Sequence, residues 1–331
     1  MRILFIYEHL FPPFDEGVKK FAHMIHKQLC NSHQVTLVRN YPGAPNIINN
    51  LLFLPRIISL CLFRKVDKIV FIPQGALTFT ALIKAHILYK LYKNKLSIVG
   101  VQKKTLKQWQ YKLIRKLTLD NIFVLSKSMI DEAKKLNKTA KTIRVGIDRE
   151  KYRPATNIDE LKNKYNLPVD KPVLLHIGHI KESRNILWLL EVQKSIPDIQ
   201  VVVIGSTATQ QENDIYSRLT DNGVKVLRDY FPDIQELYQL SNWYCFPVQN
   251  EEGAMETPLS VLEGMSTNLP IITTPFGCLI DYFQEDEYFR YVNSSQDIIN
   301  ILKNDFGSAC NNREKTRDFT WQKTSEILLS E

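Results

Sequence analysis

The sequence predicts an α/β protein of two Rossmann-like domains, each a doubly wound parallel sheet, facing each other across a cleft. Its 331 residues suggest two domains at about 100–200 residues each. Short, continuous apolar runs alternate with helical segments, as in parallel sheets whose strands are buried on both faces. This alternation stops once, at residues 146–168, and then starts again. A composition of 44% apolar and 24% charged residues excludes a disordered chain and a small disulfide scaffold.

The first half holds six runs that we expect to be strands. They are residues 2–7 (RILFIY), 34–38, 68–72 (KIVFI), 96–101 (LSIVGV), 121–124 and 141–145. Residues 17–29 have helical periodicity, and the Lys-rich amphipathic segments 81–95 and 104–116 are expected to be helices as well. Ser128 with Asp131 fits a capping box that opens the next helix.

The most apolar stretch is residues 50–63, NLLFLPRIISLCLF, which Pro55 and Arg56 interrupt. Its apolar core of about a dozen residues has the length of a buried or interfacial helix, and not of a membrane span. We expect this helix to pack on the parallel sheet.

The second half repeats the pattern after a linker that carries Pro154, a charged helix at residues 158–165, and Pro168. The expected strands are residues 173–177, 200–204, 224–227, 243–246 and 270–273. The expected helices are residues 184–195, 210–219, 234–241, 259–265, 297–304 and 321–329. We therefore predict domains at residues 1–150 and 151–331. In such folds ligands bind outside the carboxyl ends of the strands.

Charge is divided unequally between the two halves. Residues 1–150 hold 26 Lys and Arg against 9 Asp and Glu, a net charge of +17, whereas the remainder has 17 against 26, a net charge of −9. A basic half indicates an anionic surface such as nucleic acid, lipid headgroups or an acidic substrate, although a Lys-rich solvated domain is equally compatible. Five scattered cysteines and an N-terminal apolar run of about six residues indicate a cytoplasmic protein without a signal peptide.

Three loops carry residues that could bind a ligand. The first follows the strand at 173–177, where Gly178 would let the backbone approach an anion, and His179, Lys181 and Arg184 add positive charge. A diphosphate would fit there. A polar loop with surface charges is the competing interpretation.

The second loop, residues 250–265, has four carboxylates within 13 residues, at positions 251, 252, 256 and 263. Glu263 lies in a helix that begins near Pro258, and Glu256 lies at the loop-to-helix junction, where a carboxylate could accept two sugar hydroxyls. Acidic residues near a helix N-terminus are also favoured by the helix dipole alone.

The third loop, residues 8–20 (EHLFPPFDEGVKK), follows the first strand, and Gly17 opens the helix after it. The loop has neither the G-x-G-x-x-G pattern nor a Walker A lysine, so a nicotinamide dinucleotide or P-loop site has no support.

These loops, in this order and at these distances, resemble the retaining glycosyltransferases of family 4, which have the GT-B fold. The resemblance covers nearly the whole chain and is strongest over residues 174–274. Its motifs are ILFIYEHLFPPFDEGVKKF at the start, VGID and YRP in the linker, GHI followed three residues later by RN, and PLSVLEGM followed by LPIITTP. The last of these is the most specific.

The resemblance implies transfer of a sugar from a UDP- or GDP-sugar to a glycan or lipid-linked acceptor, with retention, in cell-surface polysaccharide or glycolipid biosynthesis. The second domain would bind the donor, the first the acceptor, and the last helix would pack back toward the first domain. Arg184 with His179 or Lys181 would neutralise the diphosphate, and Glu263 would hold the ribose. Thr257, Pro258 and Leu259 would line the phosphates and the donor sugar. Neither a metal nor a cofactor is implied.

The chain departs from the family pattern at several of these positions. The family has a pair of glutamates in this loop, and Glu263 matches the second of them. At the family's spacing the first falls on Met255, so the neighbouring Glu256 is the expected catalytic carboxylate and Glu252 is the alternative. The family often has a histidine where the strand at 96–101 ends, but this sequence has Gln102 there. His9 is the histidine expected on the acceptor side, with Gly17 and Gln102 beside it.

Other functions keep the fold or the charge but change the chemistry. A GT-B sugar-nucleotide epimerase would need paired acid and base carboxylates, and phosphorylases are usually longer and bind pyridoxal phosphate. A nucleic-acid-binding protein would place its Lys and Arg in stripes with exposed aromatics. Because many lysines here lie on amphipathic helices, we expect no nucleic acid, and we expect peripheral attachment to the inner face of an anionic membrane through charge.

Overall fold

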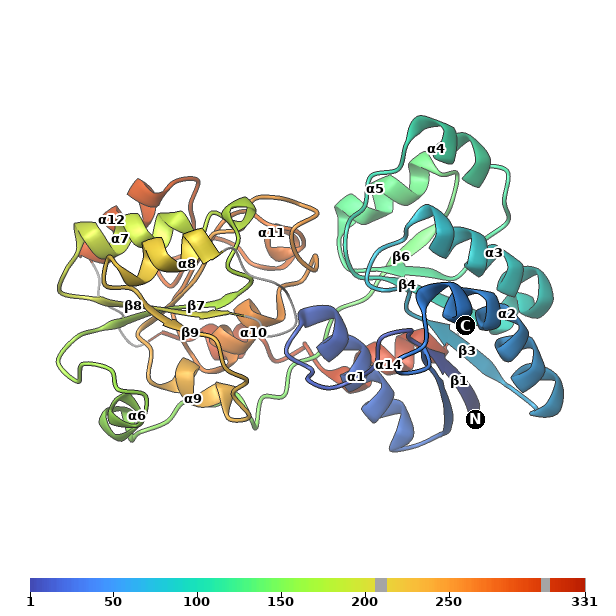
Figure 1. The fold of residues 1–331 in the computed structure, drawn as a ribbon, viewed down its shortest axis with the longest axis horizontal. Coiled ribbons are helices and arrows are strands. Elements are labelled where there is room, and N and C mark those ends of the chain that lie inside the picture. The colour runs from blue at the N-terminus through green and yellow to red at the C-terminus, as the bar shows by residue number, and fades with distance from the viewer. Residues whose placement is uncertain (206–212, 305–309, 331) are drawn as a thin grey trace. The chain divides into compact units, whose positions relative to one another are not determined.

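The computed structural model describes residues 1–205, 213–304 and 310–330, and it divides into two compact units (Figure 1). The first unit comprises Met1–Gly146, Met255–Thr257 and Trp321–Glu331, and the second comprises Ile147–Ala254 and Pro258–Thr320. The division after Gly146 lies four residues before the predicted boundary at 150. The C-terminal helix belongs to the first unit, whereas the predicted domain ranges counted it with the second.

The first unit contains a six-stranded sheet in which every neighbouring pair is parallel, in the order β2-β1-β3-β4-β5-β6. Its strands are β1 Arg2–Ile6, β2 Gln34–Val38, β3 Lys68–Phe71, β4 Leu96–Gly100, β5 Ile122–Val124 and β6 Ala140–Thr142. In register, Ile3 lies opposite Val35 on one side and Lys68 on the other. All six strands were predicted from continuous apolar runs, although β6 ends three residues earlier than expected.

Helices cover both faces of this sheet (Figure 1). One face carries α1 Gly17–Cys30 and α14 Trp321–Leu329; the other carries α2 Asn46–Phe63, α3 Phe79–Tyr92, α4 Gln108–Ile114 and α5 Lys127–Lys135. The rings of Phe21 and Trp321 lie 5.9 Å apart, and the Ser97 hydroxyl donates to the Leu328 carbonyl oxygen at 3.0 Å. The C-terminal helix is thus an integral layer of the first unit.

One local prediction in this unit was wrong, and another was confirmed in part. The cap of α5 is Ser126, whose hydroxyl oxygen accepts from the Met129 N–H at 3.2 Å; because the helix begins at Lys127, the predicted cap Ser128 lies inside its first turn. The apolar helix α2 packs on the sheet as predicted, through its buried residues Phe53 and Ile57, but Leu51, Leu62 and Phe63 are exposed. No helix in the described ranges is both long and apolar enough to cross a membrane.

The second unit contains another all-parallel, six-stranded sheet, in the order β12-β11-β10-β7-β8-β9. Its strands are β7 Val173–Gly178, β8 Gln200–Gly205, β9 Lys225–Leu227, β10 Trp243–Phe246, β11 Ile271–Thr273 and β12 Phe289–Tyr291. Strand β12 was not predicted, because it has three residues of which Phe289 alone is buried, and so shows no apolar run.

The helices of the second unit are short. They are α6 Ile158–Lys164, α7 Leu187–Ser195, α8 Asn213–Thr220, α9 Ile234–Gln239, α10 Leu259–Ser266, α11 Leu279–Tyr282, α12 Ser295–Asn304 and α13 Asn312–Lys315. The helix predicted from residue 184 begins at Leu187, because Asn185 has a left-handed backbone (φ 55°) that separates α7 from a 3-10 turn at Glu182–Arg184. Residues 210–212, predicted as the start of α8, lie outside the described residues.

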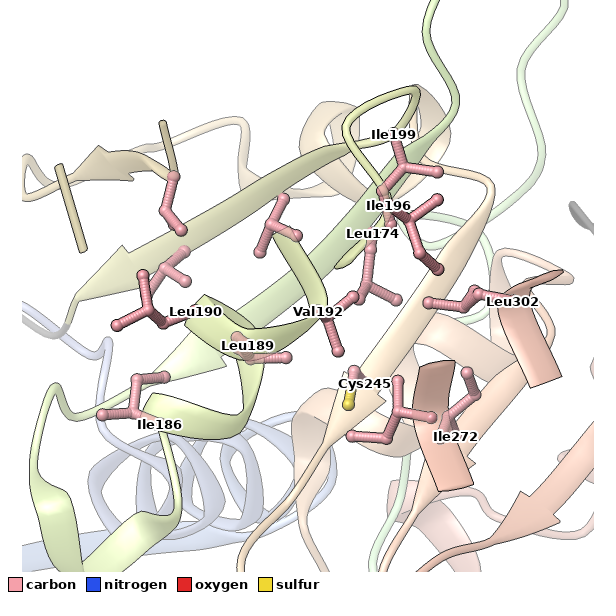
Figure 2. Close-up of a cluster of buried hydrophobic side chains, with 14 of the residues drawn as sticks. Leu174, Ile186, Leu189, Leu190, Val192, Ile196, Ile199, Cys245, Ile272 and Leu302 are labelled. Carbon is pink, nitrogen blue, oxygen red and sulfur yellow. The ribbon is translucent and has the colours of Figure 1, made fainter. Parts of the chain in front are cut away.

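An apolar core joins one face of this sheet to α7, α8 and α12 (Figure 2). Leu174 of β7, Cys245 of β10 and Ile272 of β11 pack against Leu189, Val192 and other residues of α7 and against Leu302 of α12. The helices α9 and α10 cover the opposite face (Figure 1). With apolar residues on both faces, the strands are held rigidly, and the loops at their carboxyl ends have a fixed base.

The strand order identifies where each unit can bind a ligand. In the second unit the chain runs from β7 outward to β9 and then returns to place β10 on the other side of β7. In the first unit the same reversal separates β1 from β3. At such a switch point, the two neighbouring loops leave the sheet in opposite directions, and ligands bind in the space between them.

Candidate functional site

The loop after β7 is built around Gly178, the last residue of that strand. A side-chain carbon added there would lie 3.0 Å from Nε2 of His176 and 3.2 Å from Nη1 of Arg184. The absence of a side chain therefore lets the Arg184 guanidinium lie across the end of β7. Arg184 was predicted to serve a diphosphate, and the structure positions it at the carboxyl edge of the sheet.

The loops after β7 and β10 are tied together by two side chains. Nη2 of Arg184 donates to the Gly253 carbonyl oxygen. Nδ2 of Asn185 donates to the Pro247 carbonyl oxygen at 2.9 Å and to Oε1 of Gln249 at 3.1 Å. Asn185 can reach that loop because its left-handed backbone turns the chain there. Asn185 belongs to one of the sequence motifs, but no role was predicted for it.

His176 lies beneath these loops and was missed by the sequence analysis, because it stands inside an otherwise apolar strand. Its Nδ1 lies 2.9 Å from the Cys245 carbonyl oxygen, so that nitrogen is the donor and Nε2 is an acceptor. Burial lowers the pKa of His176 to about 4, and the nearby Arg184 charge acts in the same direction. The His176 imidazole is therefore neutral near pH 7 and contributes no positive charge at the carboxyl end of β7.

The remaining predicted cations lie in the same loop. His179 and Lys181 are both half-buried, and the Lys181 N–H donates to the His179 carbonyl oxygen at 3.1 Å. Arg184 follows in the 3-10 turn. Three groups that can carry positive charge thus follow one strand end within six residues, which is the arrangement expected of an anion site.

Glu263 lies inside α10 with its carboxylate almost completely buried. The Tyr238 hydroxyl of α9 donates to Oε2 of Glu263 at 2.9 Å, which fixes the orientation of that carboxylate. Burial, and then the Glu263 charge, raise the pKa of Tyr238, so Tyr238 stays a donor. Pro258 is the N-cap of α10 and Leu259 its first residue, so the predicted start of this helix is confirmed.

The acidic loop before α10 divides between the two units. Glu256 and Thr257 are buried and belong to the first unit, where the Glu256 N–H donates to the Val101 carbonyl oxygen at 2.9 Å. The Ser128 hydroxyl donates to Oε2 of Glu256 at 3.3 Å. Glu252 belongs to the second unit, and its N–H donates to Oδ1 of Asn250 at 3.0 Å. A role for Glu256 toward the donor stays a prediction.

In the first unit, Glu8 is the centre of a polar network at the switch point between β1 and β3. This carboxylate is buried; its Oε1 lies 2.6 Å from Nζ of Lys84, and its Oε2 accepts from Nε2 of Gln74 at 2.8 Å. The same Gln74 nitrogen lies 2.9 Å from Nε2 of His9. Neither Glu8 nor Lys84 was singled out from the sequence, because the two residues are 76 positions apart.

The turn at Gln74 and Gly75 brings the predicted acceptor-side residues together. The Gly75 carbonyl oxygen accepts from the Val101 and Gln102 N–H groups, each at 2.8 Å. Gly75 has φ +96°, and a side-chain carbon there would meet Val18, the neighbour of Gly17, at 3.0 Å. His9, Gln102 and the start of α1 therefore converge on one turn, which was not predicted as part of the site.

Within the described ranges, no group of three or more His, Cys, Asp or Glu side chains could hold a metal ion. The metal-free and cofactor-free chemistry expected from the resemblance stays a prediction.

Residues 157–318, nearly all within the second unit, match the family described as "Glycosyl transferases group 1". The chain is 29% identical over 171 residues to the Escherichia coli UDP-Gal:alpha-D-GlcNAc-diphosphoundecaprenol alpha-1,3-galactosyltransferase. This match covers 47% of this chain and 42% of the galactosyltransferase. The chain is also 22% identical over 144 residues to the Arabidopsis thaliana sulfoquinovosyl transferase SQD2, and this match covers 43% of this chain and 27% of SQD2. The matched regions thus span less than half the length of these curated relatives.

Solved structures resemble the whole chain. Sucrose-phosphate synthase from Thermosynechococcus elongatus has a TM-score of 0.77 at 13% identity, covering 99% of this chain and 96% of that one. Anabaena HepE in complex with UDP has a TM-score of 0.74 at 14% identity, covering 100% and 98%. WaaG, a glycosyltransferase involved in lipopolysaccharide biosynthesis, has a TM-score of 0.70 at 14% identity, covering 99% and 100%. The prediction of two doubly wound, parallel-sheet domains in a GT-B-type fold is confirmed.

Proposed function

We propose that this protein is a metal-independent glycosyltransferase that moves a sugar from a nucleotide-sugar to an acceptor hydroxyl with retention at the anomeric carbon. The observation that carries the proposal is Arg184 lying across the end of β7, at the switch point of the unit that contains the family match. A guanidinium fixed at such an edge can stabilise a diphosphate as negative charge develops on it.

In the proposed reaction, the bond between the anomeric carbon and the diphosphate oxygen breaks, and the acceptor oxygen bonds to that carbon. The acceptor proton passes to the departing phosphate. Arg184, with Lys181 or His179, offsets the leaving charge; Glu263, oriented by Tyr238, accepts the ribose hydroxyls. Thr257, Pro258 and Leu259 line the phosphates and sugar, and Glu256 contacts the donor sugar. His9, Gly17 and Gln102 belong to the acceptor side.

The names of the relatives support a choice of substrates. The Escherichia coli relative is named for UDP-Gal and a diphosphoundecaprenol acceptor, and HepE was solved with UDP. We infer a UDP-sugar donor ahead of a GDP-sugar, and a lipid-linked acceptor or glycan of cell-surface polysaccharide or glycolipid synthesis. We place the reaction in the cytoplasm, at the inner face of the membrane.

A panel of UDP- and GDP-sugars tests the proposal. One donor should raise the melting temperature and support sugar transfer to a diphosphoprenyl-linked acceptor in the presence of EDTA. The product should have the anomeric configuration of the donor, read from its proton coupling by NMR. Conversion of the nucleotide-sugar without an acceptor would indicate an epimerase instead. If none of the nucleotide-sugars raises the melting temperature of the protein, the proposed donor site is wrong.

Glu256→Gln should lower kcat by at least about tenfold while the affinity for the nucleoside diphosphate changes little. An uncharged amide keeps the shape but removes the charge that favours a cationic sugar in the transition state. The matched variant is Glu252→Gln, which changes a carboxylate four positions away in the same acidic loop and is expected to be near wild type. Activity lost in Glu252→Gln but kept in Glu256→Gln would assign the role to Glu252.

A further inference from the structure

The outward face of α2 is an apolar stripe exposed to solvent. Ile47, Leu51, Pro55, Ile58 and Leu62 follow one another at intervals of three or four residues, which places them on one side of the helix. Ile47, Leu51 and Leu62 are 73%, 69% and 75% exposed, Pro55 is exposed as well, and Ile58 is half-buried. A helix on the surface of a soluble domain normally presents polar residues at these positions. We call these five residues the α2 stripe.

The stripe does not result from a loosely attached helix. Phe53 and Ile57, on the inner side of α2, are buried in the core that α2 shares with β3 and α3. Nζ of Lys84 lies 4.2 Å from the Phe53 ring centroid and 3.1 Å from Oδ1 of Asn50. The inner face is thus fixed on the sheet, and the helix holds its apolar outer face toward solvent. Contiguous apolar surface of this kind marks an interaction site.

The stripe ends at an apolar tip surrounded by cations. Phe63 is 88% exposed, and Leu91, near the end of α3, is 51% exposed. The segments that follow α2 and α3 are joined, because Nζ of Lys95 donates to the Val66 carbonyl oxygen at 2.9 Å. The basic residues next to these apolar tips are Arg64, Lys65, Lys93 and Lys95.

The charge around the stripe has one sign. Residues 46–95, from the start of α2 to the turn that follows α3, have eight Lys and Arg and a single acidic residue, Asp67. The Asp67 carboxylate accepts from the Arg2 N–H at 2.7 Å and lies 3.3 Å from the Arg2 guanidinium. A partner that covers this surface must therefore be apolar where it meets the stripe and anionic beside it.

We propose that the α2 stripe inserts into the headgroup boundary of an anionic membrane, with the basic residues at the ends of α2 and α3 bound to lipid phosphates. A bilayer offers both features that this surface requires, an apolar layer with negative charge directly above it. A second copy of the chain would bring the same positive charges together and is disfavoured. Insertion goes beyond the charge attraction expected from the sequence, and it does not depend on sugar transfer.

Sedimentation of the full chain with vesicles tests the inference without any donor or acceptor. Phosphatidylcholine vesicles containing phosphatidylglycerol should bind the protein far better than phosphatidylcholine alone. High salt should weaken this binding but leave a residual fraction, because salt screens charge and does not remove apolar insertion. Leu51→Gln with Leu62→Gln should lower the partition coefficient at least about tenfold at every salt concentration.

The matched control is Ile280→Gln, which removes an apolar side chain that is 59% exposed in the second unit and should leave binding unchanged. Lys65→Gln with Lys93→Gln should reduce binding at low salt only. As a second readout, Phe63→Trp should gain fluorescence that brominated lipids quench. Melting temperatures near wild type establish that each variant is folded.

Two results would overturn the inference. Unchanged binding of the Leu51→Gln/Leu62→Gln variant, with loss in the lysine variant, would show attraction by charge without insertion. A wild-type dimer in the absence of vesicles that the leucine variant converts to a monomer would show that a second copy covers the stripe. Failure of sugar transfer would affect neither result, so the inference and the proposed function fail separately.

Discussion

Arg184→Ala should lower kcat/KM for sugar transfer by about 100-fold, which corresponds to roughly 2.7 kcal/mol of transition-state stabilisation. The guanidinium lies across the end of β7, half-buried, where water screens it less than at an exposed surface. As the donor bond breaks, negative charge accumulates on the diphosphate, and a fixed cation stabilises that state more than the ground state. Arg184→Lys should recover part of the activity, because Lys keeps the charge but loses the planar pair of donors.

Arg184 also holds the Gly253 carbonyl oxygen, so a structural role must be separated from a catalytic one. The matched control is Arg290→Ala on β12, which removes a guanidinium whose Nε lies 3.4 Å from Glu285 in an exposed ion pair. Exposed pairs of this kind contribute about 0–1 kcal/mol to stability, so the control should keep full activity. Arg184→Ala with wild-type kcat/KM would refute the diphosphate role, and loss of activity together with a collapsed melting temperature would show a structural one.

Gly146→Ala should destabilise the first unit by about 3 kcal/mol and lower its melting temperature by roughly 10 °C. A side-chain carbon at Gly146 would lie 2.2 Å from the backbone nitrogen of Trp321 and 2.5 Å from its ring. Trp321 cannot move aside easily, because it opens α14 and packs on Phe21 of α1. The Thr324 hydroxyl also donates to the Arg144 carbonyl oxygen at 2.7 Å, which fixes the same helix to the same segment.

Gly17→Ala is the control for this substitution, since nothing lies within 4 Å of a side-chain carbon there and the residue opens α1. Its melting temperature should equal or slightly exceed that of the wild type, because alanine favours a helix over glycine. Calorimetry measures both variants, and limited proteolysis should release the C-terminal residues faster in Gly146→Ala. An unchanged melting temperature in Gly146→Ala would mean that α14 does not pack against Gly146 as described.

Much of the fold could be predicted because strands buried on both faces leave a local signal. The runs at β1 and β7 are apolar apart from Arg2 and His176, and the predicted bounds of β2 and β10 agree with the structure residue for residue. The last helix was also predicted with its observed bounds, Trp321–Leu329. Short elements lack this signal: β12 has three residues, and α11 and α13 have four each.

Boundaries that depend on a single backbone angle or cap were harder to predict. The start of α7 depends on the left-handed conformation of Asn185, which a helical pattern of side chains does not reveal. The cap of α5 is Ser126, although Ser128 has the same chemistry two residues later. Ser128 instead donates to Glu256, a residue 128 positions further along the chain.

The sequence by itself determined the two parallel sheets, the loops that carry the candidate groups, and the unequal division of charge. These depend on local periodicity and composition. Only the tertiary structure decided that Arg184 lies over Gly178 and reaches Gly253, that Gln74 joins His9 to the Glu8–Lys84 pair, and that α2 turns an apolar stripe to solvent. Periodicity shows that a helix has an apolar side, but which neighbour covers that side, and which distant loops meet, follows from the order in which the strands assemble.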